Sequence, residues 1–214
     1  MTKAKFKAVI FVLLLSISSV YAARALITSQ NAVPRLDKRN EARVKGTPNA
    51  PLWIVEYSDF QCDNCRQAYF VMKEYLEKYP SQIFLQVRFY PITRQHLYAL
   101  KAAIYAECAA GQKKFWEFHD ILFEKQDEWA VSQDPDSLFL GYALKVGIDP
   151  KVLEACVNDP KIKGKVEEEK IAGRDIGVDA TPTFFIGGKM ITGAKALREE
   201  LEAYFSPEKE PRGR

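Results

Sequence analysis

Two cysteines three positions apart, Cys62 and Cys65, are the residues of this chain whose type and spacing point most directly to chemistry. Thiols at this spacing can exchange disulfides, because one thiolate attacks a disulfide and its neighbour then resolves the mixed disulfide. The same spacing forms half of a zinc site, but zinc takes four ligands and no second pair with metal-binding spacing lies nearby. An inert local disulfide is the other alternative. We interpret the pair as a redox site.

The pair lies where a predicted strand gives way to a predicted helix. Residues 52–55 are continuously apolar, which is typical of a strand buried on both faces of a sheet. From Cys65 to Tyr79, apolar residues recur at spacings of three and four, as on one face of a helix. Cys62 then lies at the helix N-terminus, where unpaired N–H groups and the helix dipole stabilise a thiolate. We therefore predict that Cys62 attacks and that Cys65, one turn into the helix, resolves.

Two further features accompany the cysteines. Glu56 lies six residues before Cys62, near the end of a strand that is otherwise too apolar to hold a carboxylate without a role. Far along the chain, Thr181 and Pro182 precede residues 183–188, a short strand-like run with a turn, and a last helix follows. The sequence thus has a carboxylate near the end of the strand that leads to the cysteines and an X-Pro peptide at the entrance of a late strand.

Together, these features resemble the DsbA-like branch of the thioredoxin superfamily, the exported thiol:disulfide oxidoreductases, over about residues 51–205. The resemblance implies an α/β fold, namely a thioredoxin fold with an inserted helical subdomain. It also implies that the Thr181–Pro182 peptide is cis, faces the cysteines and binds the extended substrate chain, although a trans turn is the alternative. Glu56, in the same comparison, is a proton relay. The expected enzyme is a thiol:disulfide oxidoreductase resembling a protein disulfide oxidase.

The dipeptide between the cysteines departs from the family pattern. Asp63 and Asn64 replace the Pro-His or Pro-Tyr that is commonly seen there, and we expect them to tune the site. A carboxylate beside the Cys62 thiolate should raise the pKa of that thiol, which weakens an oxidase. Family resemblance favours an oxidase. A reductase or isomerase of the same fold, or a redox-silent chaperone or metal-binding protein, remains an alternative.

The N-terminus carries the pattern of an export signal. Lys3, Lys5 and Lys7 precede an apolar core and a small-residue cleavage site, so residues 1–22 are predicted to be a signal peptide, with an uncleaved anchor as the alternative. The chain has 31 basic and 28 acidic residues, so removing those three lysines leaves the mature protein without net charge. A nucleic-acid partner is therefore not expected. We expect a periplasmic or otherwise extracytoplasmic location.

The rest of the chain divides by composition and periodicity. Residues 23–47 are polar, and most of their charged residues are basic. They are predicted to be a flexible arm, or alternatively a dimerisation or docking segment. The predicted thioredoxin-fold domain consists of residues 48–92 and 161–205, separated by a helical insertion at 93–160. Residues 206–214 are predicted to be a disordered tail.

The predicted insertion contains the other two cysteines, Cys108 and Cys156, on helical segments with apolar neighbours. In an exported protein we expect them to form a structural disulfide, with two buried free thiols as the alternative. His119 is expected at a helix surface or core edge rather than in catalysis. On the predicted strand that starts at Ile83, Arg88 is expected to be solvated, with neutralisation of Glu56 as the alternative.

The predicted chemistry needs few other components. No metal and no organic cofactor is expected, because the Cys62–Cys65 pair itself carries the electrons. The expected partners are unfolded or cysteine-containing exported proteins, together with a membrane or soluble redox partner that recycles the pair. The protein is expected to be a monomer.

Overall fold

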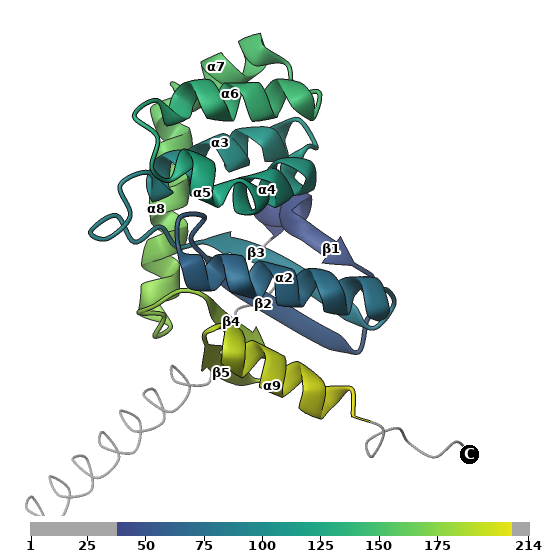
Figure 1. The fold of residues 1–214 in the computed structure, drawn as a ribbon. Helices are drawn as coiled ribbons and strands as arrows, with labels where there is room; N and C mark the ends of the chain where they lie inside the picture. The colour runs from purple at the N-terminus through teal and green to yellow at the C-terminus, as the bar shows by residue number, and fades with distance from the viewer. Residues whose placement is uncertain (1–37, 207–214) are drawn as a thin grey trace, which may run out of the picture. The chain divides into compact units, whose positions relative to one another are not determined.

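The structure, a computed structural model, describes residues 38–206. The predicted signal peptide, most of the predicted arm and residues 207–214 of the predicted tail lie outside these residues. The described chain builds a five-stranded sheet in the order β1-β3-β2-β4-β5 (Figure 1). Strands β2 and β3 are parallel, and the other neighbours are antiparallel. The strands are β1 (Val44–Gly46), β2 (Leu52–Ser58), β3 (Ile83–Phe89), β4 (Thr183–Ile186) and β5 (Lys189–Thr192).

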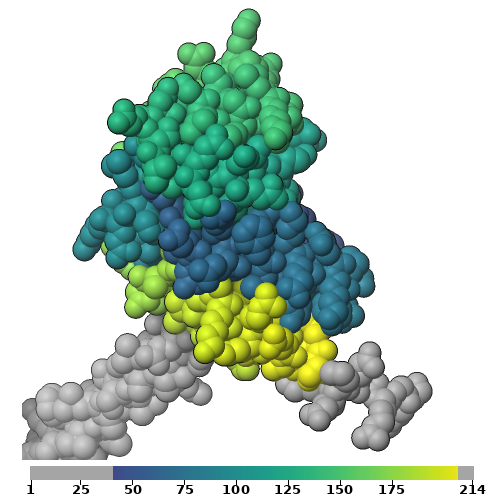
Figure 2. Space-filling model, viewed as in Figure 1, coloured from purple at the N-terminus to yellow at the C-terminus, as the bar shows by residue number. Residues whose placement is uncertain are grey.

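Helices cover the sheet and extend beyond one side of it (Figure 1). Helices α2 and α9 contact each other, and Figure 2 shows α9, in yellow, beside the blue surface to which α2 belongs. The helices are η1 (Lys38–Arg43), α2 (Asp63–Lys78), α3 (Ala99–Gly111), α4 (Phe115–Glu124), α5 (Gln126–Trp129), α6 (Pro135–Lys145), α7 (Pro150–Val157), α8 (Pro160–Asp175) and α9 (Ala194–Tyr204).

Strand β2 is buried on both faces, as its apolar sequence predicts. Leu52 and Ile54 belong to the main hydrophobic core, which also includes buried residues of α2 and α9. Val55 and Tyr57 face the other way and pack in a second cluster beneath α8. A Cβ at Gly173 of α8 would lie 2.7 Å from the Tyr57 ring, so only glycine allows this close approach. Both layers therefore hold β2 in place.

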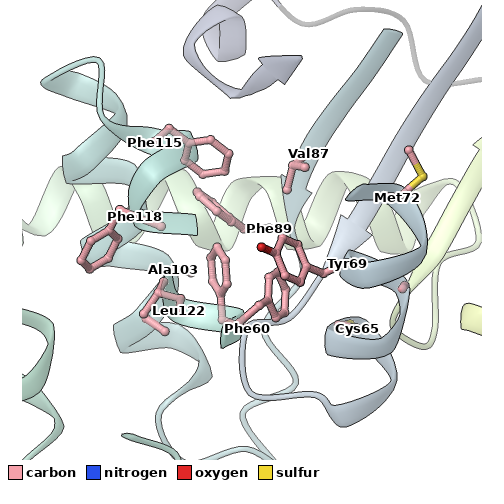
Figure 3. Packing of buried hydrophobic residues seen from close by; sticks show 14 of the residues in the cluster. Phe60, Cys65, Tyr69, Met72, Val87, Phe89, Ala103, Phe115, Phe118 and Leu122 are labelled. Atoms are coloured by element: carbon pink, nitrogen blue, oxygen red, sulfur yellow. The ribbon is translucent and has the colours of Figure 1, made fainter. Parts of the chain in front are cut away.

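Aromatic rings join the helical insertion to the sheet. Phe60, in the loop before α2, packs against Phe89 of β3 and Phe123 of α4, with ring centroids 6.1 and 5.0 Å apart respectively. Figure 3 shows the rings of Phe60 and Phe89 beside Phe115 and Phe118, which both belong to α4. The loop that leads to Cys62 is thus anchored in a core shared by the sheet and the insertion.

Cys108 of α3 and Cys156 of α7 are joined by a disulfide, with their Cα atoms 5.8 Å apart. The bond closes a loop of 48 residues in sequence. In the chain-entropy account, such a crosslink stabilises the fold by about 4 kcal/mol. The disulfide therefore joins α7 to the buried helix α3.

The prediction of a flexible arm is wrong for residues 38–46, the part of the arm whose secondary structure is described here. Residues 38–46 form η1 and β1, and β1 pairs antiparallel with β3. Arg43 is buried, forms hydrogen bonds of 2.8 and 2.6 Å with Glu169 of α8, and lies over the Phe89 ring. Local composition suggested a solvated segment because the acidic partner lies 126 residues further along the chain.

Two smaller expectations also need correction. Arg88 is buried rather than solvated, and donates to the Tyr57 hydroxyl at 3.1 Å. His119 is not at a surface: it is 5% exposed and contacts several aromatic rings. Arg88 is buried because its partner Tyr57 lies on the neighbouring strand, and His119 is buried because aromatic rings from other elements surround it.

No helix between residues 38 and 206 is both long enough and apolar enough to cross a membrane.

Candidate functional site

Cys62 is the N-cap residue of α2, and Cys65 lies one turn into the helix. Both are free thiols, with Cys65 fully buried and Cys62 9% exposed. The Cys62 N–H donates to the Asp59 carbonyl at 3.1 Å, which closes the turn before the helix. The predicted placement at the junction of strand and helix is therefore what the structure has, although Cys62 is less exposed than a helix end usually is.

The pKa of Cys62 is lowered to about 6. The largest cause is the hydrogen bond from the Cys65 thiol, and the backbone N–H groups of Cys65 and Asn64 also lower it, while burial opposes them. These are the donors that a helix N-terminus leaves unpaired. At neutral pH, a thiol with this pKa is roughly ten to one in the thiolate form. Cys62 is therefore the sulfur of the pair that ionises more readily.

The pKa of Cys65 moves in the opposite direction. Burial raises it well above its ordinary value, and the neighbouring Cys62 raises it further. A thiol that keeps its proton can donate to the adjacent thiolate, which is the interaction that lowers the pKa of Cys62. The two cysteines therefore share one negative charge, held mainly on the outer sulfur.

The Thr181–Pro182 peptide is cis and lies against the cysteines. The Thr181 carbonyl is 3.4 Å from the Cys62 sulfur, a contact in which the protonated thiol donates. The Thr181 hydroxyl is buried and has no hydrogen-bond partner among the described residues. Segments 119 residues apart are thus brought together at one sulfur.

Glu56 lies on β2, where it is 2% exposed. Burial raises its pKa to about 7, against the smaller effect of a hydrogen bond with Ser58. One carboxyl oxygen has no hydrogen-bond partner in the described part of the chain. Glu56, Tyr69 and Met72 line a small cavity of about 20 Å³, enough for roughly one water molecule. Tyr69 is one turn beyond Cys65, so this cavity lies along the helix face that carries the inner thiol.

The two residues between the cysteines point to different surroundings. Asp63 is exposed at the first position of α2. Asn64 instead accepts the N–H of Ala194 at 2.8 Å through its side-chain oxygen. Ala194 is the first residue of α9, so Asn64 caps that helix and ties it to the cysteine pair.

Sequence reasoning missed three polar residues around this site. Asp59 and His96 lie together behind the cysteines, their side chains 2.7 Å apart. Gln126 of α5 donates to the carbonyls of Phe60 and Cys62, at 2.7 and 3.2 Å. Only Asp59 had a local signal, because its side chain accepts the N–H two residues later, as Asp does in an Asx turn.

No group of three or more potential metal-ligating side chains gathers anywhere in residues 38–206. The cysteine pair is thus surrounded by backbone donors, aromatic rings and the Asp59–His96 pair. This arrangement is suited to holding and releasing a thiolate.

Comparisons with known proteins place the chain in a family. A family model described as Thioredoxin matches residues 38–204. The Na(+)/H(+) antiporter NhaA 3 of Salinispora tropica is 36% identical over 146 residues, which are 68% of this chain but 22% of that protein. The chain therefore spans about a fifth of the length of this curated relative.

Solved structures show the same fold. Alpha-DsbA1 of Wolbachia pipientis is 24% identical, with a TM-score of 0.67 over 82% of this chain and 94% of that one. The thiol-disulfide exchange protein alpha-DsbA2 of the same organism is 22% identical, with a TM-score of 0.64 over 85% and 98%. The predicted fold class, a thioredoxin fold with a helical insertion, is confirmed. The chain belongs to the thioredoxin family and has a DsbA-like fold.

Proposed function

We propose that this chain is an exported thiol:disulfide oxidoreductase that exchanges disulfides with protein substrates through Cys62 and Cys65, and that it works as a disulfide-forming oxidase. The observation that carries the proposal is the opposite shift of the two thiol pKa values at a helix N-terminus. This arrangement gives one sulfur that attacks or leaves readily and one that is protected from solvent.

The oxidising cycle begins with the Cys62–Cys65 disulfide. A substrate thiolate attacks the Cys62 sulfur, so an intermolecular disulfide forms and Cys65 leaves as a thiolate that takes up a proton. A second thiolate of the substrate then attacks the substrate sulfur of the mixed disulfide. This step forms the substrate's own disulfide and releases Cys62 as a thiolate. Two substrate thiols have lost two electrons and two protons, and the cysteine pair has gained the electrons.

The lowered pKa of Cys62 favours this direction over reduction. A stabilised thiolate makes the reduced pair more stable, and this makes its disulfide a stronger oxidant. The charge of Asp63 had argued for a weaker oxidant, but the donors on Cys62 outweigh it. A reductase or isomerase acting through the same two sulfurs is the alternative.

Other residues have supporting roles in this proposal. Thr181 and Pro182 receive the extended substrate chain beside Cys62, supported by the contact between the Thr181 carbonyl and the sulfur. Glu56 accepts and returns the proton of Cys65, supported by its raised pKa near 7 and its unpaired oxygen. No metal or organic cofactor enters the cycle.

The proposal extends to location and partners. An extracytoplasmic enzyme would meet unfolded, cysteine-containing exported proteins, and a membrane or soluble redox partner would restore its disulfide. The export signal predicted at residues 1–22 and the structural disulfide both support an oxidising compartment.

Activity is tested with insulin as a disulfide substrate and a dithiol as the reductant. We expect the wild-type chain to accelerate insulin reduction and Cys62→Ser to abolish that acceleration, because the attacking sulfur is gone. A control variant, Cys65→Ser, should accumulate a mixed disulfide with the substrate. Wild-type protein with no effect on insulin would refute the proposed exchange activity.

Direction is tested by equilibrating the cysteine pair against glutathione. A reduction potential near about −120 mV would support an oxidase, and one near about −270 mV would support a reductase. We expect a value on the oxidising side.

A further inference from the structure

A buried carboxylate organises the loop that precedes the cysteines. The Asp59 side chain is 0% exposed. One of its oxygens accepts the N–H of Gln61 at 2.8 Å, and the other accepts the N–H of Ile92 at 2.7 Å. The second oxygen is also 2.7 Å from Nδ1 of His96. Asp59 thus joins the loop before α2 to the loop after β3.

The same residue is in direct contact with the cysteine pair. The Asp59 N–H donates to the Cys65 sulfur at 3.4 Å, and its carbonyl accepts the N–H of Cys62 at 3.1 Å. Its carboxylate, however, places a negative charge close to sulfurs that must become thiolates, and it raises the pKa of Cys65. Like charges at short range disfavour each other, and a buried carboxylate without a counter-charge is costly. The loop therefore needs a positive charge here.

His96 is placed to supply that charge. Its side chain is 20% exposed, and the hydrogen bond to Asp59 raises its pKa, with smaller contributions from Cys62 and Asp63. These three acidic groups come from the loop before α2 and from the start of that helix. The dipeptide between the cysteines, Asp63 and Asn64, contains no cation of its own.

We propose that His96 is a positioning residue for disulfide exchange: its protonated ring neutralises the Asp59 carboxylate behind the cysteines and so favours the Cys62 thiolate and the reduced pair. This inference rests on the proposed function, because it concerns the redox poise of those two sulfurs. Asp59 keeps its three hydrogen-bond contacts while its charge is cancelled. The cation that the dipeptide lacks comes instead from the loop after β3.

The coupling must be reciprocal. If protonated His96 stabilises the Cys62 thiolate, then the thiolate stabilises protonated His96 by the same factor. The His96 pKa is then higher in the reduced protein than in the disulfide form. A residue that only holds the loop in place would show no such difference.

The variant His96→Asn separates charge from structure. The Asn side-chain amide can occupy the position of Nδ1 and still donate to Asp59, but it cannot carry a proton charge. We expect the Cys62 pKa to rise by about half a unit to one unit, which lowers the thiolate equilibrium about three- to tenfold. Ultraviolet thiolate absorbance of the full chain measures this shift. Arg94→Gln is the matched control, because it removes an exposed cation from the same loop, and should leave the Cys62 titration unchanged.

The wild-type protein provides a second test, in which a variant serves only to assign the spectrum. The chain has two histidines, so the NMR titration of their ring protons gives two sets of signals. The signals that are missing from His96→Asn belong to His96. We expect its midpoint to be higher in the reduced protein than in the oxidised protein. Equal midpoints in the two forms, or an unchanged Cys62 titration in His96→Asn, would overturn the inference. If no redox-active thiol titrates at all, the proposed function itself fails.

Discussion

The Cys62 sulfur has hydrogen-bond partners from different parts of the chain. The Cys65 thiol and the first backbone N–H groups of α2 are local donors, whereas the Thr181 carbonyl, which accepts from the protonated thiol, lies at the entrance of β4. Because these donors are fixed by the fold, the thiolate does not need a cation inside the dipeptide. The charge of Asp63 can therefore be studied separately from the other influences on this sulfur.

The first prediction concerns that charge. Asp63→Asn keeps the size of the side chain and removes a negative charge beside Cys62, so we expect the Cys62 pKa to fall. Asp63 is exposed, so solvent and salt screen the effect to about a few tenths of a unit. Thiolate absorbance at low and high salt measures the shift. A shift of the same size at both salt concentrations would contradict a simple charge effect.

The second prediction concerns Glu56, whose pKa is raised from 4.5 to about 7. Below pH 4.5 the carboxyl is protonated whether the chain is folded or unfolded, and it does not affect stability. As the pH rises toward 7 only the unfolded chain ionises freely, so the folded protein loses stability, by about 3 kcal/mol once the pH exceeds 7. Glu56→Gln removes this loss.

Urea unfolding of the reduced protein measures that difference. We expect Glu56→Gln to be more stable than wild type at pH 8 and equal to it near pH 4. If Glu56 also relays the proton of Cys65, the variant should exchange disulfides more slowly despite its greater stability. A variant that is less stable at pH 8 would show that the carboxylate has a stabilising partner.

At the scale of elements, periodicity predicted most of the helices and strands around the cysteines. Strand β2 and helix α2 follow from an apolar run and from spacings of three and four, and both are local properties. Asp149 caps α7 and Pro150 follows it at the first helical position, an order that is itself a local signal for a helix start. The short β1 gave no such signal, since its place at the sheet edge depends on pairing with β3.

The third prediction tests the link between α2 and α9. Asn64→Ala removes the oxygen that accepts the Ala194 N–H, so we expect a loss of about 0.5–2 kcal/mol of stability. Asn64→Asp is the control, because it keeps an acceptor and adds a negative charge at a helix N-terminus, which is favourable. Urea unfolding compares the two. Equal losses in both variants would mean that the cap contributes little.

The fourth prediction concerns the two cysteine pairs. Cys62 and Cys65 are free thiols at the start of α2, whereas Cys108 is 2% exposed within a bridge between α3 and α7. When both pairs are oxidised, a mild dithiol should reduce the Cys62–Cys65 disulfide of the native protein and leave the Cys108–Cys156 disulfide intact. Thiol counting before and after unfolding measures this, and four thiols released together in native protein would contradict it.

Replacing both Cys108 and Cys156 by Ala should lower the free energy of unfolding by about 2–4 kcal/mol, since the crosslink no longer restricts the unfolded chain. Insulin reduction should continue, because the other pair is untouched. The comparison therefore separates the structural bridge from the pair proposed to exchange disulfides.

At the scale of the whole described chain, the sequence could not reveal the polar contacts between distant segments. Arg43 pairs with Glu169, and His96 lies beside Asp59, but neither pair shares a local pattern. The two cysteines were identified from their spacing and local context, whereas the position of Pro182 beside them was predicted from a family pattern, which carries long-range information that periodicity lacks. Buried polar residues that hold a loop through its backbone have no such pattern in one sequence.

The last prediction concerns Gln126, through which the insertion holds the loop before α2. Its side chain is 1% exposed and donates to the carbonyls of Phe60 and Cys62. Gln126→Ala leaves two buried carbonyls short of a donor, which should cost about 1–3 kcal/mol. Hydrogen exchange should become faster at the loop amides, with α7 as the internal control. If exchange is instead faster throughout the chain, Gln126 stabilises the fold as a whole rather than the loop that positions Cys62.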